Sequence, residues 1–133
     1  MKNKIIKVNK NDLEDTIKLY NNDDFIVIDI DGQQIKNTRE FFEIIEKKLS
    51  FPTACDDILA RFADWITDLT WIERNKGICI VIKSFSELAS GDTKFQDILI
   101  EEFEENILPY WEYDVVNIMV GGSVRNFVLI ISE

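Results

Sequence analysis

The sequence contains no histidine, and this absence excludes several kinds of catalytic site. Ser-His-Asp and Cys-His nucleophilic sites both need an imidazole, and so does every metal site that uses one as a ligand. The only two cysteines are Cys55 and Cys79, so a zinc site of four cysteines is excluded as well. Carboxylate chemistry, with or without Mg²⁺, is the catalytic repertoire that remains.

Long apolar runs are also missing. No run approaches the ~20 residues that a membrane-spanning helix needs. The first residues, MKNKIIKVNKNDLED, hold lysines but no apolar segment suited to a signal peptide. Two isolated cysteines are typical of a reducing compartment. We therefore expect a cytoplasmic protein with reduced thiols and no membrane partner.

Basic residues are few, with 15 Lys and Arg against 25 Asp and Glu, which gives a formal net charge of −10. Such a charge repels the phosphates of nucleic acids and of anionic membranes. It favours a basic protein partner, although colloidal stability alone is an alternative explanation. A length of 133 residues with 46% hydrophobic content indicates one globular domain.

Apolar runs alternate with helical patterns along the chain. The runs predict buried strands at 25–30, 77–83 and 126–132, and the patterns predict helices at 37–50, 56–69 and 93–107. This order is typical of a small three-layer α/β domain, with a mainly parallel three-stranded sheet and packed helices. Residues 1–23 are polar, and we expect an extension outside the core, with the domain at 24–133. Residues 109–122 fit either a kinked helix or a strand, because Pro109 disturbs the pattern.

The run FIVIDIDGQQI at 25–35 places two carboxylates at a strand end. Asp29 and Asp31 could be the nucleophile and acid of a small Mg²⁺-dependent phosphatase of the haloacid-dehalogenase type. That chemistry needs a Thr or Val after Asp-Gly and a later acidic pair, and neither follows here. The alternative interpretation, an Asp31-Gly32 turn after a buried strand, explains the run without catalysis.

The helix predicted at 56–69 has two different sides. Its apolar residues gather on one side, and these are Ile58, Leu59, Phe62, Ile66 and Leu69, with Trp65 at the edge. The opposite side carries Asp57, Arg61, Asp64 and Asp68, with Ala60 beside them. Asp57 and Arg61 are spaced to form an ion pair. Such an acidic row suits a basic cleft, although an ordinary solvated helix face is the alternative.

Two stretches carry a family resemblance. IDIDGQQIKNTREFFEIIEKKLSFP, followed by TACDDILARFADWITDLTWI, resembles the barstar family, intracellular inhibitors of bacterial ribonucleases. The matching positions are Asp31-Gly32, Phe51-Pro52, Leu59, Phe62, Asp64, Asp68, Leu69 and Trp71. The resemblance covers about 25–72 by motif and 77–132 by element order, and it implies a barstar-like fold.

The chain departs from the family pattern within the binding segment. Ala54 and Cys55 replace two aromatic residues, and Asp56 replaces a glycine. Ala60 stands where the first of two aspartates occurs, which leaves Asp64 as the second. The resemblance implies that these aspartates take the place of substrate phosphate in a ribonuclease active site.

We therefore predict an inhibitor or immunity protein, not an enzyme, that occludes the active site of a basic toxin, most simply a ribonuclease. The predicted contact residues are Asp64, Asp57, Asp68, Ala60, Arg61, Asp56, Cys55 and Ala54. We expect no metal, no cofactor and a monomer in the free state. An acidic interaction domain unrelated to nucleases is the remaining alternative.

Overall fold

A computed structural model describes residues 2–133 of the chain. Its strands are β1 (Lys4–Val8), β2 (Phe25–Asp31), β3 (Gly77–Lys83) and β4 (Phe127–Ser132). Its α-helices are α1 (Lys10–Asn21), α2 (Thr38–Lys48), α3 (Leu59–Ile66), α4 (Phe95–Glu102) and α5 (Val115–Ile118). Short 3₁₀ turns follow β2 and β3, and two π-helical turns, Phe103–Ile107 and Tyr110–Asp114, lie between α4 and α5. None of the helices in this part of the chain is long and apolar enough to cross a bilayer.

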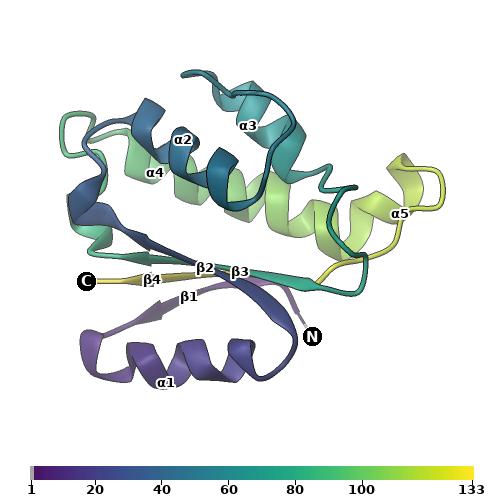
Figure 1. Ribbon diagram of the computed structural model, residues 1–133, viewed down its shortest axis with the longest axis horizontal. Helices are drawn as coiled ribbons and strands as arrows, with labels where there is room; N and C mark the ends of the chain where they lie inside the picture. Colours follow the sequence, from purple (N-terminus) through teal and green to yellow (C-terminus); the bar gives the residue numbers. More distant parts are fainter. Residues whose placement is uncertain (1) are drawn as a thin grey trace.

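The four strands form one parallel sheet in the order β1-β4-β3-β2. Successive side chains point to opposite faces of a sheet, and both faces are covered here. One face, with Ile80 and Leu129, packs under the helices α2 to α5, while the other, with Val81 and Ile130, packs against α1 (Figure 1). The three-layer α/β fold expected from the sequence is confirmed, but the parallel sheet has four strands rather than three.

Residues 4–21 supply the fourth strand and the helix that covers the second face of the sheet, so the expectation that residues 1–23 lie outside the core is wrong for this segment. β1 pairs with β4 from Lys4↔Val128 to Val8↔Ser132. Leu13, Ile17 and Tyr20 of α1 are buried against the sheet. Most residues around them are polar and exposed, so the sequence of this helix shows only a narrow apolar stripe.

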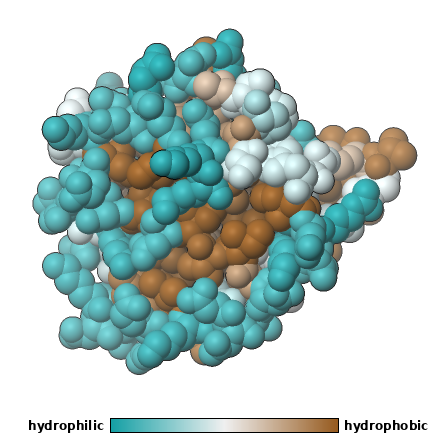
Figure 2. Space-filling view, in the orientation of Figure 1, coloured by the Kyte–Doolittle hydropathy of each residue, from teal (hydrophilic) through white to brown (hydrophobic). Residues whose placement is uncertain are grey.

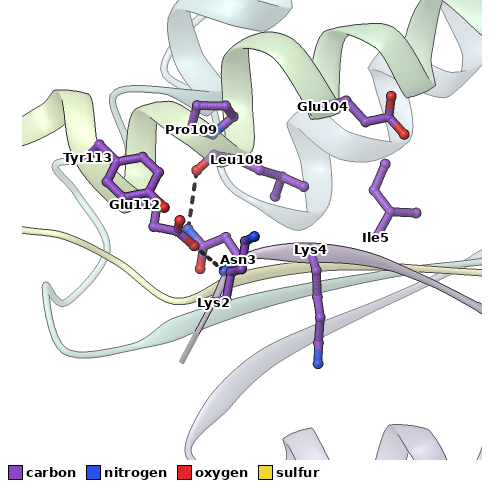
Figure 3. Close-up of a pocket in the computed structure, with 9 residues that line it drawn as sticks. All are labelled: Lys2, Asn3, Lys4, Ile5, Glu104, Leu108, Pro109, Glu112 and Tyr113. Carbon is purple, nitrogen blue, oxygen red and sulfur yellow. Dashed lines mark hydrogen bonds between the residues drawn. The ribbon is translucent and has the colours of Figure 1, made fainter.

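The start of β1 is fixed by the buried side chain of Asn3. Its amide donates to the carbonyl oxygens of Leu108, at 3.3 Å, and Arg125, at 3.0 Å, while its Oδ1 accepts from the N–H of Phe127. The Asn3 N–H also donates to the Glu112 carboxylate (Figure 3). These contacts connect the first residues to segments more than 100 positions away. They also supply the hydrogen bonds that a buried amide needs.

The helix predictions are confirmed in position but not always in length. Asn37 caps α2 by accepting from the N–H of Glu40 at 2.9 Å. α3 is shorter than predicted, so Asp57 and Asp68 lie just outside its two ends. Residues 109–118 continue the preceding helix, and Pro109 stands between the two π turns. A π turn widens the helix, which is how it accommodates a residue that lacks an N–H.

Gly77 allows β3 to pass beside the ring of Phe25, its register partner in β2. A Cβ at Gly77 would lie 2.7 Å from two carbon atoms of that ring. The ring itself makes an edge-to-face contact with Tyr20, at a centroid distance of 5.0 Å. A close approach of this kind is a structural reason for a glycine inside a strand.

The loop after α5 is an apolar projection from the surface. Ile118 is 70% exposed and Val120 is fully exposed. Figure 2 shows the same feature as a brown tip at the right, where Figure 1 places α5 and its loop. Arg74 holds the loop to the body by donating to the Gly121 carbonyl oxygen at 3.1 Å.

Candidate functional site

The segment 51–58, which we call the binding loop, is anchored to α2 at its centre. The N–H of Cys55 donates to the Glu46 carboxylate at 3.0 Å, and the N–H of Phe51 donates to the Glu46 carbonyl oxygen at 2.9 Å. The Cys55 carbonyl oxygen then accepts from the N–H of Ile58, the N-cap residue of α3. The binding loop therefore leads into α3 with a defined geometry.

Asp56 adopts a left-handed backbone conformation, with a φ of 53°. This conformation favours glycine, and aspartate is among the residues that tolerate it best. It gives a physical reason for the glycine that the barstar pattern has at this position. The Asp56 carboxylate accepts from Arg61 at 2.6 Å, and Arg39 lies 3.9 Å away. The predicted pairing of Asp57 with Arg61 is therefore wrong, since Arg61 binds the neighbouring carboxylate.

The helix α3 turns its apolar side to the core, as predicted. Phe62 and Ile66 are completely buried, whereas Ile58 is 42% exposed and does not belong to the buried stripe. The Trp111 indole donates to the Ile66 carbonyl oxygen at 2.9 Å and secures the last turn of the helix. The side of α3 that carries Asp64 is thereby held facing solvent.

A surface depression of about 310 Å³, the Asp64 cleft, borders this exposed side. Its lining residues are Thr53, Arg61, Asp64, Trp65 and Asp68. The Trp65 indole donates to Thr53 Oγ1 at 3.0 Å and packs edge-on against Trp71. This bond connects the binding loop to α3 across the cleft, so both walls of the cleft belong to one packed unit.

The Asp64 and Asp68 carboxylates at the Asp64 cleft differ in their exposure and in their hydrogen bonds. Asp64 is exposed, and within residues 2–133 its carboxylate has no ion pair. Asp68 is half-buried and accepts from the N–H of Thr70 at 3.3 Å. Burial, and to a smaller extent the charge of Asp68, raise the pKa of the Tyr110 phenol. Neither carboxylate has an ion pair among residues 2–133, and Asp64 is the more exposed of the two.

The structure brings only part of the predicted contact set together. Arg61, Asp64 and Asp68 share the Asp64 cleft, whereas Asp57 lines a separate depression at the start of α3. Ala54 and Ala60 are exposed near the cleft segments. Cys55 has no exposed surface, so its prediction as an exposed contact residue is wrong.

Two residues of the site were missed from the sequence. Thr53 accepts the Trp65 hydrogen bond, and Glu46 holds the binding loop from a distance of nine positions. Both are common surface residue types, and their roles depend on how a loop folds back onto a helix. A hydrogen bond between the Glu46 carboxylate and the N–H of Cys55 in the loop leaves no local pattern in the sequence.

Burial raises the pKa of the Cys55 thiol to about 12, with a smaller contribution from the charge of Glu46. The pKa of Cys79 is also raised to about 12 by burial. Only the thiolate is the reactive nucleophile. We therefore expect neither thiol to react with 5,5′-dithiobis(2-nitrobenzoate) at pH 8 in the folded protein, and both to react at once in concentrated urea. Rapid reaction of one thiol without denaturant would contradict the burial of Cys55.

Asp29 and Asp31 each have a partner within the described residues. Lys83 lies 2.9 Å from the Asp29 carboxylate, and this hydrogen bond raises the pKa of the lysine ammonium. Asp31 accepts from the N–H of Gln33 at 3.0 Å and begins the 3₁₀ turn. Among residues 2–133, no group of three or more acidic or cysteine side chains is arranged to hold a metal ion. The turn interpretation thus explains Asp31, and the ion pair with Lys83 gives Asp29 a structural role.

Comparison with known proteins agrees with this geometry. The model of the Barstar (barnase inhibitor) family matches residues 25–118, which run from β2 to the end of α5 and include the binding loop and α3. No curated protein matches the chain. β1 and α1 precede the matched segment, and β4 follows it. Since the match covers most of the chain, this protein belongs to the Barstar (barnase inhibitor) family.

Proposed function

We propose that the chain inhibits a basic toxin, of the ribonuclease class, by inserting the binding loop and α3 into its active-site cleft. The observation that carries the proposal is the Asp64 carboxylate, which is exposed and without an ion pair within the described residues. A carboxylate in this state has its charge available for a cation on another molecule. A ribonuclease cleft supplies such cations, because it binds the phosphates of its substrate.

Asp64 is also preorganised for binding. The N–H of Cys55 is bonded to Glu46 before α3, and the Ile66 carbonyl oxygen is bonded to Trp111 at its end. Rigid presentation of a charge lowers the entropic cost of association. Negative charge facing a basic surface also raises the rate of encounter.

The neighbouring residues have supporting roles in this proposal. Asp68 adds negative charge at the edge of the Asp64 cleft, and Ala60 lets a partner approach the helix closely. Arg61 is neutralised by Asp56, which reduces its repulsion of a basic partner. An arginine beside the central carboxylate also discriminates between partners, because a cation placed opposite it is disfavoured. Ala54 and Asp56 complete the contact surface on the binding loop.

The direct test is the substitution Asp64→Asn, with binding measured by calorimetry against a small basic ribonuclease that the unchanged chain inhibits. Removing one member of a desolvated charge pair costs about 2–5 kcal/mol, so we expect affinity to fall roughly 30- to 1,000-fold. The melting temperature should stay unchanged, because the Asp64 side chain is exposed and has no ion pair among residues 2–133. Ribonuclease inhibition should weaken in parallel with binding.

Asp15→Asn is the matched control, because it removes the same charge from the exposed side of α1. It should leave affinity unchanged at physiological salt. Equal losses for the two variants would show that only the overall charge matters, and would favour the acidic interaction domain unrelated to nucleases. Unchanged inhibition by the Asp64→Asn protein would overturn the proposed mechanism.

A further inference from the structure

A second depression, which we call the Asp57 pocket, lies at the opposite end of α3 from Asp68. It has a volume of about 270 Å³ and lies between the starts of α2, α3 and α4. Asp57 and Leu59 come from the entry to α3, and Asp92 comes from the loop before α4. No local sequence pattern groups these residues, since α2 and α4 are far apart along the chain.

The floor of the Asp57 pocket is apolar and rigid. Phe42 and Phe95 are almost completely buried and meet edge-to-face, with their ring centroids 5.9 Å apart. Phe42 also stacks on Phe62, at 5.1 Å. Leu59 is half-buried and Ile98 is 42% exposed, so aliphatic surface remains accessible above the rings. Such a surface suits the aliphatic portion of a long side chain.

The charged groups of the Asp57 pocket are all negative. Asp57 and Asp92 are exposed, and no cation lies within ion-pair distance of either in residues 2–133. Thr38 Oγ1 donates to Asp92 at 3.4 Å, which leaves most of the acceptor capacity of that carboxylate free. A cavity with an aliphatic wall and two carboxylates that have no ion pair among the described residues is complementary to a long cationic side chain.

We propose that the Asp57 pocket receives an arginine side chain of the protein that covers Asp64. Arginine fits better than lysine, because its planar guanidinium presents several donors to two carboxylates and is more weakly hydrated. Leu59 and Asp64 are five residues apart, about 7.5 Å along the axis of α3 and about 140° around it, so a partner that reaches both extends around the start of the helix. One partner of ordinary interface size covers both places. The inference rests on the proposed function, from which it takes the identity of the partner.

The test is a titration of the ¹⁵N-labelled full chain with N-acetyl-arginine amide, followed by NMR at low ionic strength, where exposed charges are least screened. We expect saturable shifts at the amides of Asp57, Leu59 and Asp92, with a dissociation constant on the order of 1–10 mM. N-acetyl-citrulline amide has the same shape without the charge. It should bind at least roughly fivefold more weakly.

Two double variants separate a pocket from a general charge effect. Asp57→Asn/Asp92→Asn should weaken the arginine titration at least roughly fivefold. Asp97→Asn/Glu101→Gln removes the same charge from exposed positions outside the pocket and should leave the titration unchanged. Equal binding of citrulline, no effect of the first variant, or shifts spread over all acidic surfaces without saturation would each overturn the inference.

The titration uses no toxin, so its failure can be distinguished from a failure of the proposed function. Asp64→Asn should leave the arginine titration intact while it weakens the toxin complex. If that complex requires Asp64 but the arginine probe does not bind, only the Asp57 pocket loses its assignment. If the probe binds but no ribonuclease is inhibited, the pocket remains an arginine site and its assigned partner is wrong.

Discussion

A chain that begins at residue 24 is expected to lose cooperative folding. Such a chain lacks α1, so Cys79 and Val128 are uncovered on one face of the sheet. It also lacks β1, so β4 has no partner strand on one side. Leu13, Ile17 and Tyr20 are buried side chains whose burial contributes roughly 5–9 kcal/mol in total. This equals a large part of the 5–15 kcal/mol that is typical of an entire domain. Urea unfolding followed by circular dichroism measures the loss.

Point variants within α1 provide a control that keeps the chain length. Ile17→Ala should lower the free energy of unfolding by about 2–5 kcal/mol, because it leaves a cavity against the sheet. Leu19→Ala, on the exposed side of the same helix, should change it by less than about 0.5 kcal/mol. If the shortened chain unfolded cooperatively at an unchanged urea midpoint, the boundary predicted from the sequence at residue 24 would be correct after all.

Arg125→Met is expected to destabilise the protein by about 3–5 kcal/mol. Arg125 is only 6% exposed, and desolvation lowers the pKa of its guanidinium. It donates to carbonyl oxygens of the loop after α3, and these belong to Leu69, Ile72, Glu73 and Lys76. It also lies over the Trp111 ring, 5.0 Å from the centroid. Methionine fills the space but donates no hydrogen bond, so the carbonyl oxygens of Ile72 and Lys76 lose the donor that Arg125 supplies, whereas those of Leu69 and Glu73 keep a backbone donor.

The result for Arg125→Lys distinguishes charge from geometry. Lysine keeps the charge but cannot reach several carbonyl oxygens in one plane, so we expect a loss of about 2 kcal/mol. Arg74→Lys is the matched control, because Arg74 is exposed and makes one hydrogen bond, to Gly121. It should cost less than about 0.5 kcal/mol. Full stability of the Arg125→Lys protein would show that the hydrogen-bond pattern contributes little.

The elements that the sequence predicted well are those with complete local signals. β3 spans 77–83 as expected, because a run of apolar residues flanked by a turn is typical of a strand buried on both faces. Asn37 caps α2 because the side chain and the N–H that it accepts from are three residues apart. The position of Asp64 on the outer side of α3 followed from helical periodicity alone.

The errors arose where distant segments decide the structure. The apolar residues of α1 are few and become core only because β3 and β4 offer an uncovered face. α3 ends early because Leu69 takes a left-handed conformation, with a φ of 50°, which helical periodicity does not reveal. Cys55 is buried where its N–H donates to the Glu46 carboxylate of α2. The Asp57 pocket forms where three helices meet.

The position of β4 between β1 and β3 has a consequence for how the molecule acquires its structure. β1 and β4 stand at opposite ends of the sequence, so their pairing closes one of the largest loops that the chain can form. Contacts of high sequence separation slow folding, because the entropy of loop closure is lost before the contacts form. During synthesis, β1 has no strand to pair with until residues 127–132 emerge from the ribosome. Until then α1 can pack only on the part of the sheet face that β2 and β3 provide.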